Sequence, residues 1–205
     1  MVMRWLWLVG ITLLILMALT YVTYAENQSI SLKVVNEIPL YGSQVFSLVY
    51  NPVNNDVYVI LNNDTMLIVS AITNQVINAV NIPISSFLIP EVSIYDPNNS
   101  NIYIAASNPY TKVGVIYVFS TSTNTVITTI SMNGTILNMV YNPINNYIYV
   151  VSPSLNEIIV ISGSTNNILV SIPISNPGAI LYDQANGSST WVVQGISRSF
   201  PAYQS

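Results

Sequence analysis

The chain of 205 residues has no cysteine and no histidine, and Lys and Arg together number only four. Without cysteine, it has no disulfide framework and no thiolate metal site. Without histidine, it lacks the side chain best suited to proton transfer near neutral pH, which excludes Ser-His and Cys-His nucleophile pairs and imidazole zinc sites. Four cations cannot form a basic patch, so we expect no binding to nucleic acid.

Charge of either sign is scarce, because charged residues make up 6% of the chain and hydrophobic residues 51%. Ordinary soluble domains carry about a quarter charged residues. The surface is therefore expected to be wetted by Asn, Ser, Thr and Tyr. With so few titrating groups, we expect the free energy of unfolding to change little between about pH 3 and pH 7.

The carboxylates are spread along the chain and form no cluster in the sequence. They are Glu26, Glu37, Asp56, Asp64, Glu91, Asp96, Glu157 and Asp183. A paired acid–base site would need two converging carboxylates, and a calcium loop would need an Asp-x-Asp-x-Asp run. Asp96 and Asp183 stand where the repeats described below have Asn51 and Asn142, which indicates turn capping. We therefore expect no catalytic residue, metal or cofactor.

Residues 1–25 have the composition of a targeting segment. Arg4 is the only charge before Glu26, residues 5–22 are strongly apolar, and Ala25 offers a small residue for cleavage. Two alternatives remain open, a signal peptide cleaved after Ala25 or an uncleaved membrane anchor over residues 5–22. Both place residues 26–205 outside the cytoplasm, secreted or held at the cell surface, because Arg4 stays inside.

Five N-glycosylation sequons agree with this location. All five fall in expected turns or in the exposed terminus, although a chain rich in Asn, Ser and Thr also forms such triplets by chance. The acceptor residues are Asn27, Asn63, Asn98, Asn133 and Asn186.

A ten-residue phrase recurs along the chain. It begins at Tyr50, Tyr95 and Tyr141, and a degenerate copy begins at Tyr182, with steps of 45, 46 and 41 residues. The intact copies read YNPVNNDVYV, YDPNNSNIYI and YNPINNYIYV. Asn or Asp before Pro starts a turn, and the following Asn residues tolerate a positive φ. Each intact copy is followed by two apolar runs joined by a Thr-Asn pair, which predicts a second hairpin.

The repeat predicts an all-β fold of propeller-type blades with four antiparallel strands each. Its apolar runs are nearly continuous, as in sheets that are covered on both faces. Within a domain of residues 26–205, we expect three full blades and a split or partial fourth. First strands are expected near residues 46–50, 92–95, 137–141 and 179–182. The expected blades are residues 43–84, 88–132, 136–174 and a partial 178–205, which a strand at 31–40 would complete.

The repeats resemble the YVTN family of β-propeller repeats, which occur in secreted and surface proteins of archaea and bacteria. The match is carried by Tyr141-Asn142-Pro143, by residues 148–151 and 156–161, and by the Ile-Pro-Ile triplet at 172–174. It covers roughly residues 30–193. The resemblance implies propeller architecture and no particular activity, and this chain has fewer blades than the usual ring of about seven.

Two features are candidates for recognition. Tyr58, Tyr103 and Tyr149 recur at one strand position and predict either an aromatic platform or, as we favour, repeated packing between blades. The second repeat carries an enlarged loop at residues 107–114, whose Tyr110 and Lys112 would contact a partner unless the loop is neutral drift.

These observations favour a non-catalytic protein that binds a protein or a surface glycan at the cell surface. A hydrolase or lyase on a propeller scaffold is the alternative, and a remnant of a longer propeller is a third interpretation. An open row of blades would leave two apolar end faces, so we expect ring closure or self-association.

Overall fold

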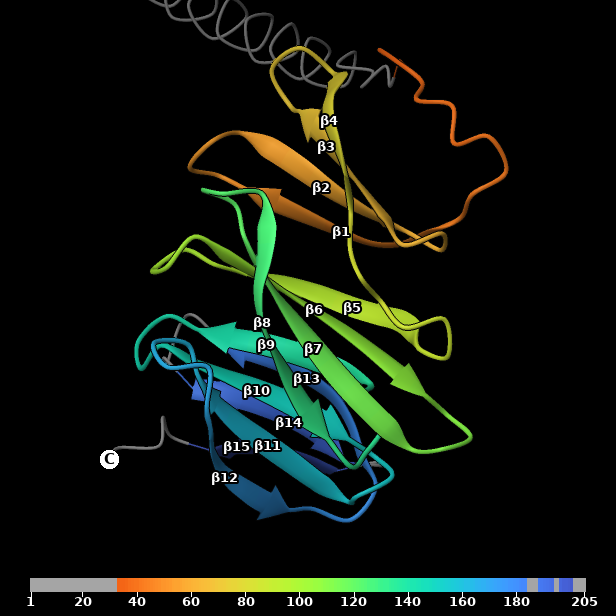
Figure 1. The fold of residues 1–205 in the computed structure, drawn as a ribbon. Coiled ribbons are helices and arrows are strands. Elements are labelled where there is room, and N and C mark those ends of the chain that lie inside the picture. Colours follow the sequence, from red (N-terminus) through yellow and green to blue (C-terminus); the bar gives the residue numbers. More distant parts are fainter. Residues whose placement is uncertain (1–32, 184–187, 194–195, 201–205) are drawn as a thin grey trace, which may run out of the picture. The chain divides into compact units, whose positions relative to one another are not determined.

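The computed structural model describes residues 33–183, 188–193 and 196–200, and every regular element in them is a β-strand (Figure 1). Residues 33–37 belong to one unit of the chain and Ile38–Ser205 form a second, compact unit that contains all the strands. No helix in the described part of the chain is long and apolar enough to cross a membrane. The targeting segment at 1–25 lies outside the described residues.

The strands form four antiparallel sheets in which chain neighbours pair. The first sheet holds β1 (Val45–Asn51), β2 (Asp56–Leu61), β3 (Thr65–Ser70) and β4 (Gln75–Asn81). The second holds β5 (Ile89–Asp96), β6 (Asn101–Asn108), β7 (Val113–Ser120) and β8 (Thr125–Met132). The third holds β9 (Asn138–Asn142), β10 (Tyr147–Ser152), β11 (Glu157–Ser162) and β12 (Ile168–Pro173). The fourth holds β13 (Pro177–Asp183), β14 (Ser188–Val193) and β15 (Ile196–Phe200).

The first strands of successive sheets lie against one another, β1 beside β5, β5 beside β9 and β9 beside β13. The second and third sheets lie between the first and the fourth (Figure 1). This arrangement confirms propeller-type blades, with the first strand of each blade where the repeat predicts it.

The fourth blade differs from the expectation in one respect. Its third strand is β15, which follows β14 directly, whereas we expected only two strands after residue 178 and completion by a strand at 31–40. That expectation was wrong for the described residues 33–40, which form no strand. Ile38 and Leu40 instead pack against Val59, Leu61 and Val69 of the first sheet. Residues 38–40 therefore cover part of the apolar outer face of the first sheet, and burial of this apolar surface is favourable. The fourth sheet already has a third strand, β15, at that edge.

The asparagines of the repeated phrase hold its turn and its tyrosine together. The backbone N–H groups of Val53, Asn98 and Ile144 donate to the side chains of Asn51, Asp96 and Asn142, each at 2.9 Å. Three residues after each capping side chain comes an asparagine whose amide donates to a tyrosine hydroxyl. The pairs are Asn54 with Tyr58, Asn99 with Tyr103 and Asn145 with Tyr149, at 2.9, 3.2 and 3.0 Å. The residues that close these turns, Asn55, Ser100 and Asn146, have φ near +57°, as expected for turn asparagines and their substitutes.

Each of these buried tyrosines faces the next sheet along the chain. Tyr58 meets Phe119 edge-on, with ring centroids 6.2 Å apart, in the core between the first and second sheets. Tyr103 lies in the core between the second and third sheets, and Tyr149 in the core that includes Ile180 of the fourth. All three are buried, which confirms the packing interpretation over an exposed aromatic platform.

The hydroxyl of Tyr103 also joins two blades. It donates to Asn166 Oδ1 of the third repeat at 2.7 Å and lies 3.3 Å from the carbonyl oxygen of Gly163. The amide of Asn99 donates to the same Gly163 carbonyl at 2.8 Å. Packing between these sheets is therefore fixed in register by hydrogen bonds as well as by apolar area.

We predict that Tyr103→Phe lowers the free energy of unfolding by about 1–3 kcal/mol, because it removes the bonds of the buried hydroxyl to the part-buried side chains of Asn99 and Asn166. Urea denaturation measures the loss. Tyr41→Phe is the matched control, since Tyr41 is exposed. Equal stabilities of the two variants would show that the hydroxyl of Tyr103 contributes nothing.

Candidate functional site

The carboxylates remain apart in the folded chain. Among the described residues, no three Asp or Glu side chains gather where they could hold a metal ion. Asp96 caps its turn as predicted, while Asp183 ends β13. The carboxylates in the described residues thus form no cluster of three or more.

Asp96 is nevertheless unusual, because its carboxyl is fully buried between the second and third blades. Oδ1 accepts the turn N–H of Asn98, but Oδ2 is buried without a hydrogen-bond partner. Burial raises the pKa of Asp96, and the polar groups of Asn98, Tyr141 and Asn99 only partly oppose the shift. The pKa of Tyr141 is raised as well, first by burial and then by the negative charge of Asp96.

Gly163 is the residue that admits this carboxyl. A Cβ at Gly163 would lie 2.7 Å from Asp96 Oδ2 and 2.6 Å from Asn146 Oδ1. The matching positions of the first two repeats hold Ala71 and Thr121. The structure explains Gly163 as a packing requirement of this junction.

We predict that Asp96→Asn raises the free energy of unfolding at pH 7 by about 1–2 kcal/mol, because it removes a buried charge and keeps the cap that Asn51 and Asn142 provide. In the native chain, a raised folded-state pKa makes the folded form bind the proton more tightly. The contribution of Asp96 to the free energy of unfolding is therefore fully present below its ordinary pKa of 3.8. It is lost as the pH rises through the folded-state pKa.

Urea denaturation of both chains between pH 3 and pH 7 tests this prediction, and the variant should depend less on pH. Some dependence of the same sign remains, because burial also raises the pKa values of Asp56 and Glu91. A variant that is less stable than the native chain at pH 7 would contradict it.

Three of the sequon asparagines lie in described residues, and all three are exposed in turns or bends. They are Asn63, Asn98 and Asn133. Asn27 and Asn186 lie outside the described residues.

The enlarged loop of the second repeat is a longer hairpin. β6 and β7 have eight residues each, whereas β10 and β11 of the third repeat have six. The added rungs pair Ser107 with Gly114 and Asn108 with Val113. The enlarged loop expected over 107–114 is thus shorter than predicted, because residues 107–108 and 113–114 complete their backbone hydrogen bonds as strand pairs and leave residues 109–112 as the turn.

Asn108 ties the tip of this hairpin to the linker between the first and second blades. Its Oδ1 accepts the N–H groups of Tyr110 and Thr111 at 2.8 and 3.0 Å, and its amide donates to the carbonyl of Phe87 at 2.8 Å. The N–H of Lys112 donates to the carbonyl of Asn108 at 2.9 Å, and Lys112 has a positive φ of 55°. The side chain of Asn108 therefore stabilises the turn and also holds the hairpin tip against the linker.

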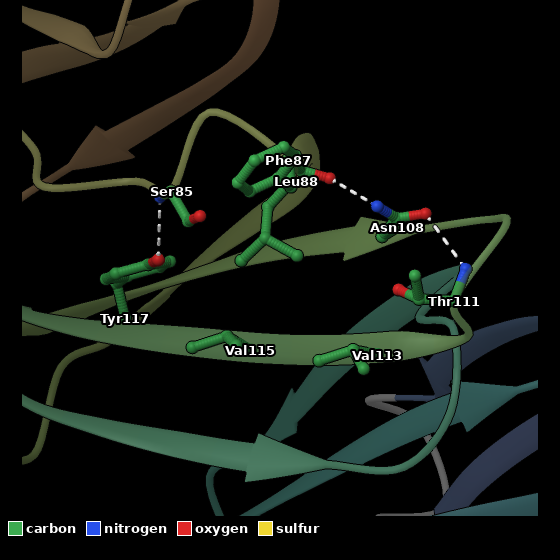
Figure 2. Close-up of a pocket in the computed structure, with 8 residues that line it drawn as sticks. All are labelled: Ser85, Phe87, Leu88, Asn108, Thr111, Val113, Val115 and Tyr117. Atoms are coloured by element: carbon green, nitrogen blue, oxygen red, sulfur yellow. Dashed lines mark hydrogen bonds between the residues drawn. The ribbon is translucent and has the colours of Figure 1, made fainter.

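A pocket of about 460 Å³ lies between the extended hairpin and the linker (Figure 2). The backbone N–H of Ser85 donates to the hydroxyl of Tyr117 at 3.3 Å at one side of it. Its lining is mainly apolar and contains no charged side chain. The lining residues are Ser85, Phe87, Leu88, Asn108, Thr111, Val113, Val115 and Tyr117.

The matching place at the next junction is filled. There Leu155 packs into the core between the second and third sheets, and the hydroxyl of Ser154 accepts the N–H of Thr135 at 2.8 Å. Leu155 precedes the positive-φ residue of its turn, as Thr111 precedes Lys112. A short Thr in place of Leu, on a hairpin two rungs longer, leaves the pocket open in the second blade.

Two aromatic side chains are exposed on the pieces that form the pocket. Phe87 is 77% exposed on the linker and Tyr110 is 93% exposed at the hairpin tip, beside the exposed Lys112. Tyr110 and Lys112 were predicted from the enlarged loop, whereas Phe87 and the pocket were not. The sequence signal for them would have been the apolar Phe-Leu pair at 87–88, which follows two serines in the linker.

Comparison with known proteins supports the fold alone. No family model and no curated protein matches the chain. The chain is similar in structure to Kuenenia stuttgartiensis hydrazine synthase, with a TM-score of 0.61 and 15% identity, over 80% of this chain and 46% of that one. It thus spans about half the length of that protein. It is also similar to the computationally designed Ika4 protein, with a TM-score of 0.63 and 11% identity, over 83% of this chain and 99% of that one.

Proposed function

We propose that this protein is a non-catalytic binding module outside the cytoplasm, and that it holds an apolar side chain of a partner protein in the pocket under its extended hairpin. The observation that carries the proposal is the pocket itself, which exists at one blade junction and is filled by Leu155 at the next. Membership of the YVTN repeat family is part of the same proposal and rests on the repeated phrase.

The chemistry of the pocket favours a protein partner over a surface glycan. Its walls are largely aliphatic and aromatic, and the amide of Asn108 is already used by the hairpin turn and by Phe87. The lining contains no carboxylate and no second planar amide, so it has few groups that could bond the hydroxyls of a glycan. Exposed aromatic rings beside a small apolar pocket are typical of the anchor points of protein interfaces.

The pocket also favours binding over hydrolysis. A hydrolase or lyase needs several convergent groups that transfer protons or stabilise charge. Tyr117 is the only titratable residue in this lining, and its hydroxyl accepts the backbone N–H of Ser85. A location outside the cytoplasm is supported by the composition of residues 1–25 and by the exposure of Asn63, Asn98 and Asn133. Intact mass of the chain purified from its source would show whether glycans are attached.

We predict that the full chain binds N-acetyl-phenylalaninamide in this pocket, and that Val115→Trp abolishes the binding by filling the space. Saturation-transfer NMR with this probe, N-acetyl-leucinamide and methyl glucoside measures the preference. Val76→Trp is the control, because Val76 is on the edge strand β4 of the first sheet, away from the pocket lining. Binding of methyl glucoside alone would favour a glycan, and an unchanged signal in Val115→Trp would refute the pocket as the site.

A further inference from the structure

The same two strand positions come together wherever two blades meet. At the first junction, Ser47 Oγ of β1 lies 2.6 Å from Ser93 Oγ of β5. At the second, the equivalent residues Val92 and Met139 share one apolar core. At the third, the amide of Asn138 donates to the carbonyl of Ile180 at 3.5 Å. The residue three before the phrase tyrosine in one blade thus meets the residue two before it in the next.

At each end of the row of blades, one of these two strand positions faces no further blade among the described residues. The first blade presents Leu48, which is 62% exposed, whereas its equivalents Ser93, Met139 and Ile180 are 8%, 4% and 6% exposed. The fourth blade presents Ala179, which is also exposed, next to Leu181 at 51%. A large apolar side chain at one end and a small one at the other are complementary in size, as Met139 and Val92 are inside.

The segment before β1 covers only part of the first face. Ile38 and Leu40 lie over the apolar group formed by β2 and β3. Phe46, Leu48 and Tyr50 of β1 remain exposed. Tyr50 is equivalent to Tyr95 and Tyr141, which are packed against the cores of the first and second junctions. The uncovered part is therefore the strip that a preceding blade covers elsewhere in the fold.

We propose that the Ala179 end of one chain packs on the Leu48 end of a second copy, in the same geometry as the internal junctions. Two copies joined in this way at both ends form a closed pair with no open end face. The smaller face, of three strands of ordinary length and spacing, measures about 300 Å², so the two junctions together would bury about 1,200 Å². That area is typical of stable protein–protein interfaces.

Packing of two Leu48 faces on each other is less favourable. It would leave the Ala179 end of each copy exposed, and it would use a pairing that occurs nowhere among the three junctions within the chain. Head-to-tail packing reuses a contact that the sequence has already adapted three times.

Disulfide trapping tests the proposal cleanly, because the native chain has no cysteine. Full-length Leu48→Cys and Ala179→Cys chains, each with a single thiol, are mixed in mild detergent and oxidised. We expect a disulfide-linked dimer that forms roughly a hundredfold faster than in the control mixture, since association raises the local thiol concentration from about 10 micromolar to about 1 millimolar. The control mixture combines Ala179→Cys with Val53→Cys, because Val53 is exposed in the turn between β1 and β2.

The double variant Leu48→Cys, Ala179→Cys separates the remaining outcomes. A cross-linked dimer supports the proposal, and an intrachain disulfide in a monomer overturns it in favour of ring closure. Dimers in the Leu48→Cys chain alone, formed as fast as in the mixture, overturn it in favour of face-to-face packing. Cross-linking of the mixture no faster than the control overturns it altogether.

Discussion

The fold depends on a tyrosine hydroxyl that is buried between blades and has a hydrogen-bond partner within its own blade. In each intact repeat, the second Asn of the turn donates its amide to the tyrosine four residues later. A large ring can then be buried against the next sheet without an unsatisfied hydroxyl. Asn, Pro and Tyr recur together because the turn, the hydrogen bond and the core contact form one unit.

Two departures from the repeated sequence change the local structure of the blades. Asp96 replaces a neutral cap by a buried carboxyl, and Gly163 leaves it room. The hairpin of the second blade is two rungs longer, and Thr111 stands where the third blade has Leu155. The first change alters how stability depends on pH, and the second creates a pocket. A repeat scaffold tolerates such local changes because each blade contacts only its neighbours.

The scarcity of charge gives this protein an unusual balance of forces. Adhesion between sheets comes from apolar area and from amide and hydroxyl groups of Asn, Ser and Tyr, as in the pair Ser47 and Ser93. Such contacts can be repeated at a free end, because most residues of the end strands are uncharged; the charged residues there are Asp56 of β2, Asp183 of β13 and Arg198 of β15. The ends of the row therefore resemble the junctions inside it, apart from the cover that Ile38 and Leu40 supply.

The sequence by itself determined the blades, their first strands, the capped turns and the burial of Tyr58, Tyr103 and Tyr149, because each depends on residues close in the chain and repeated in order. It also pointed to Tyr110 and Lys112. Only the tertiary structure decided that residues 107–114 extend a hairpin, that Phe87 and Val115 line one pocket, and that residues 38–40 lie on the first sheet. These features depend on how one blade meets the next, and packing between segments far apart in sequence leaves no periodic signal to read.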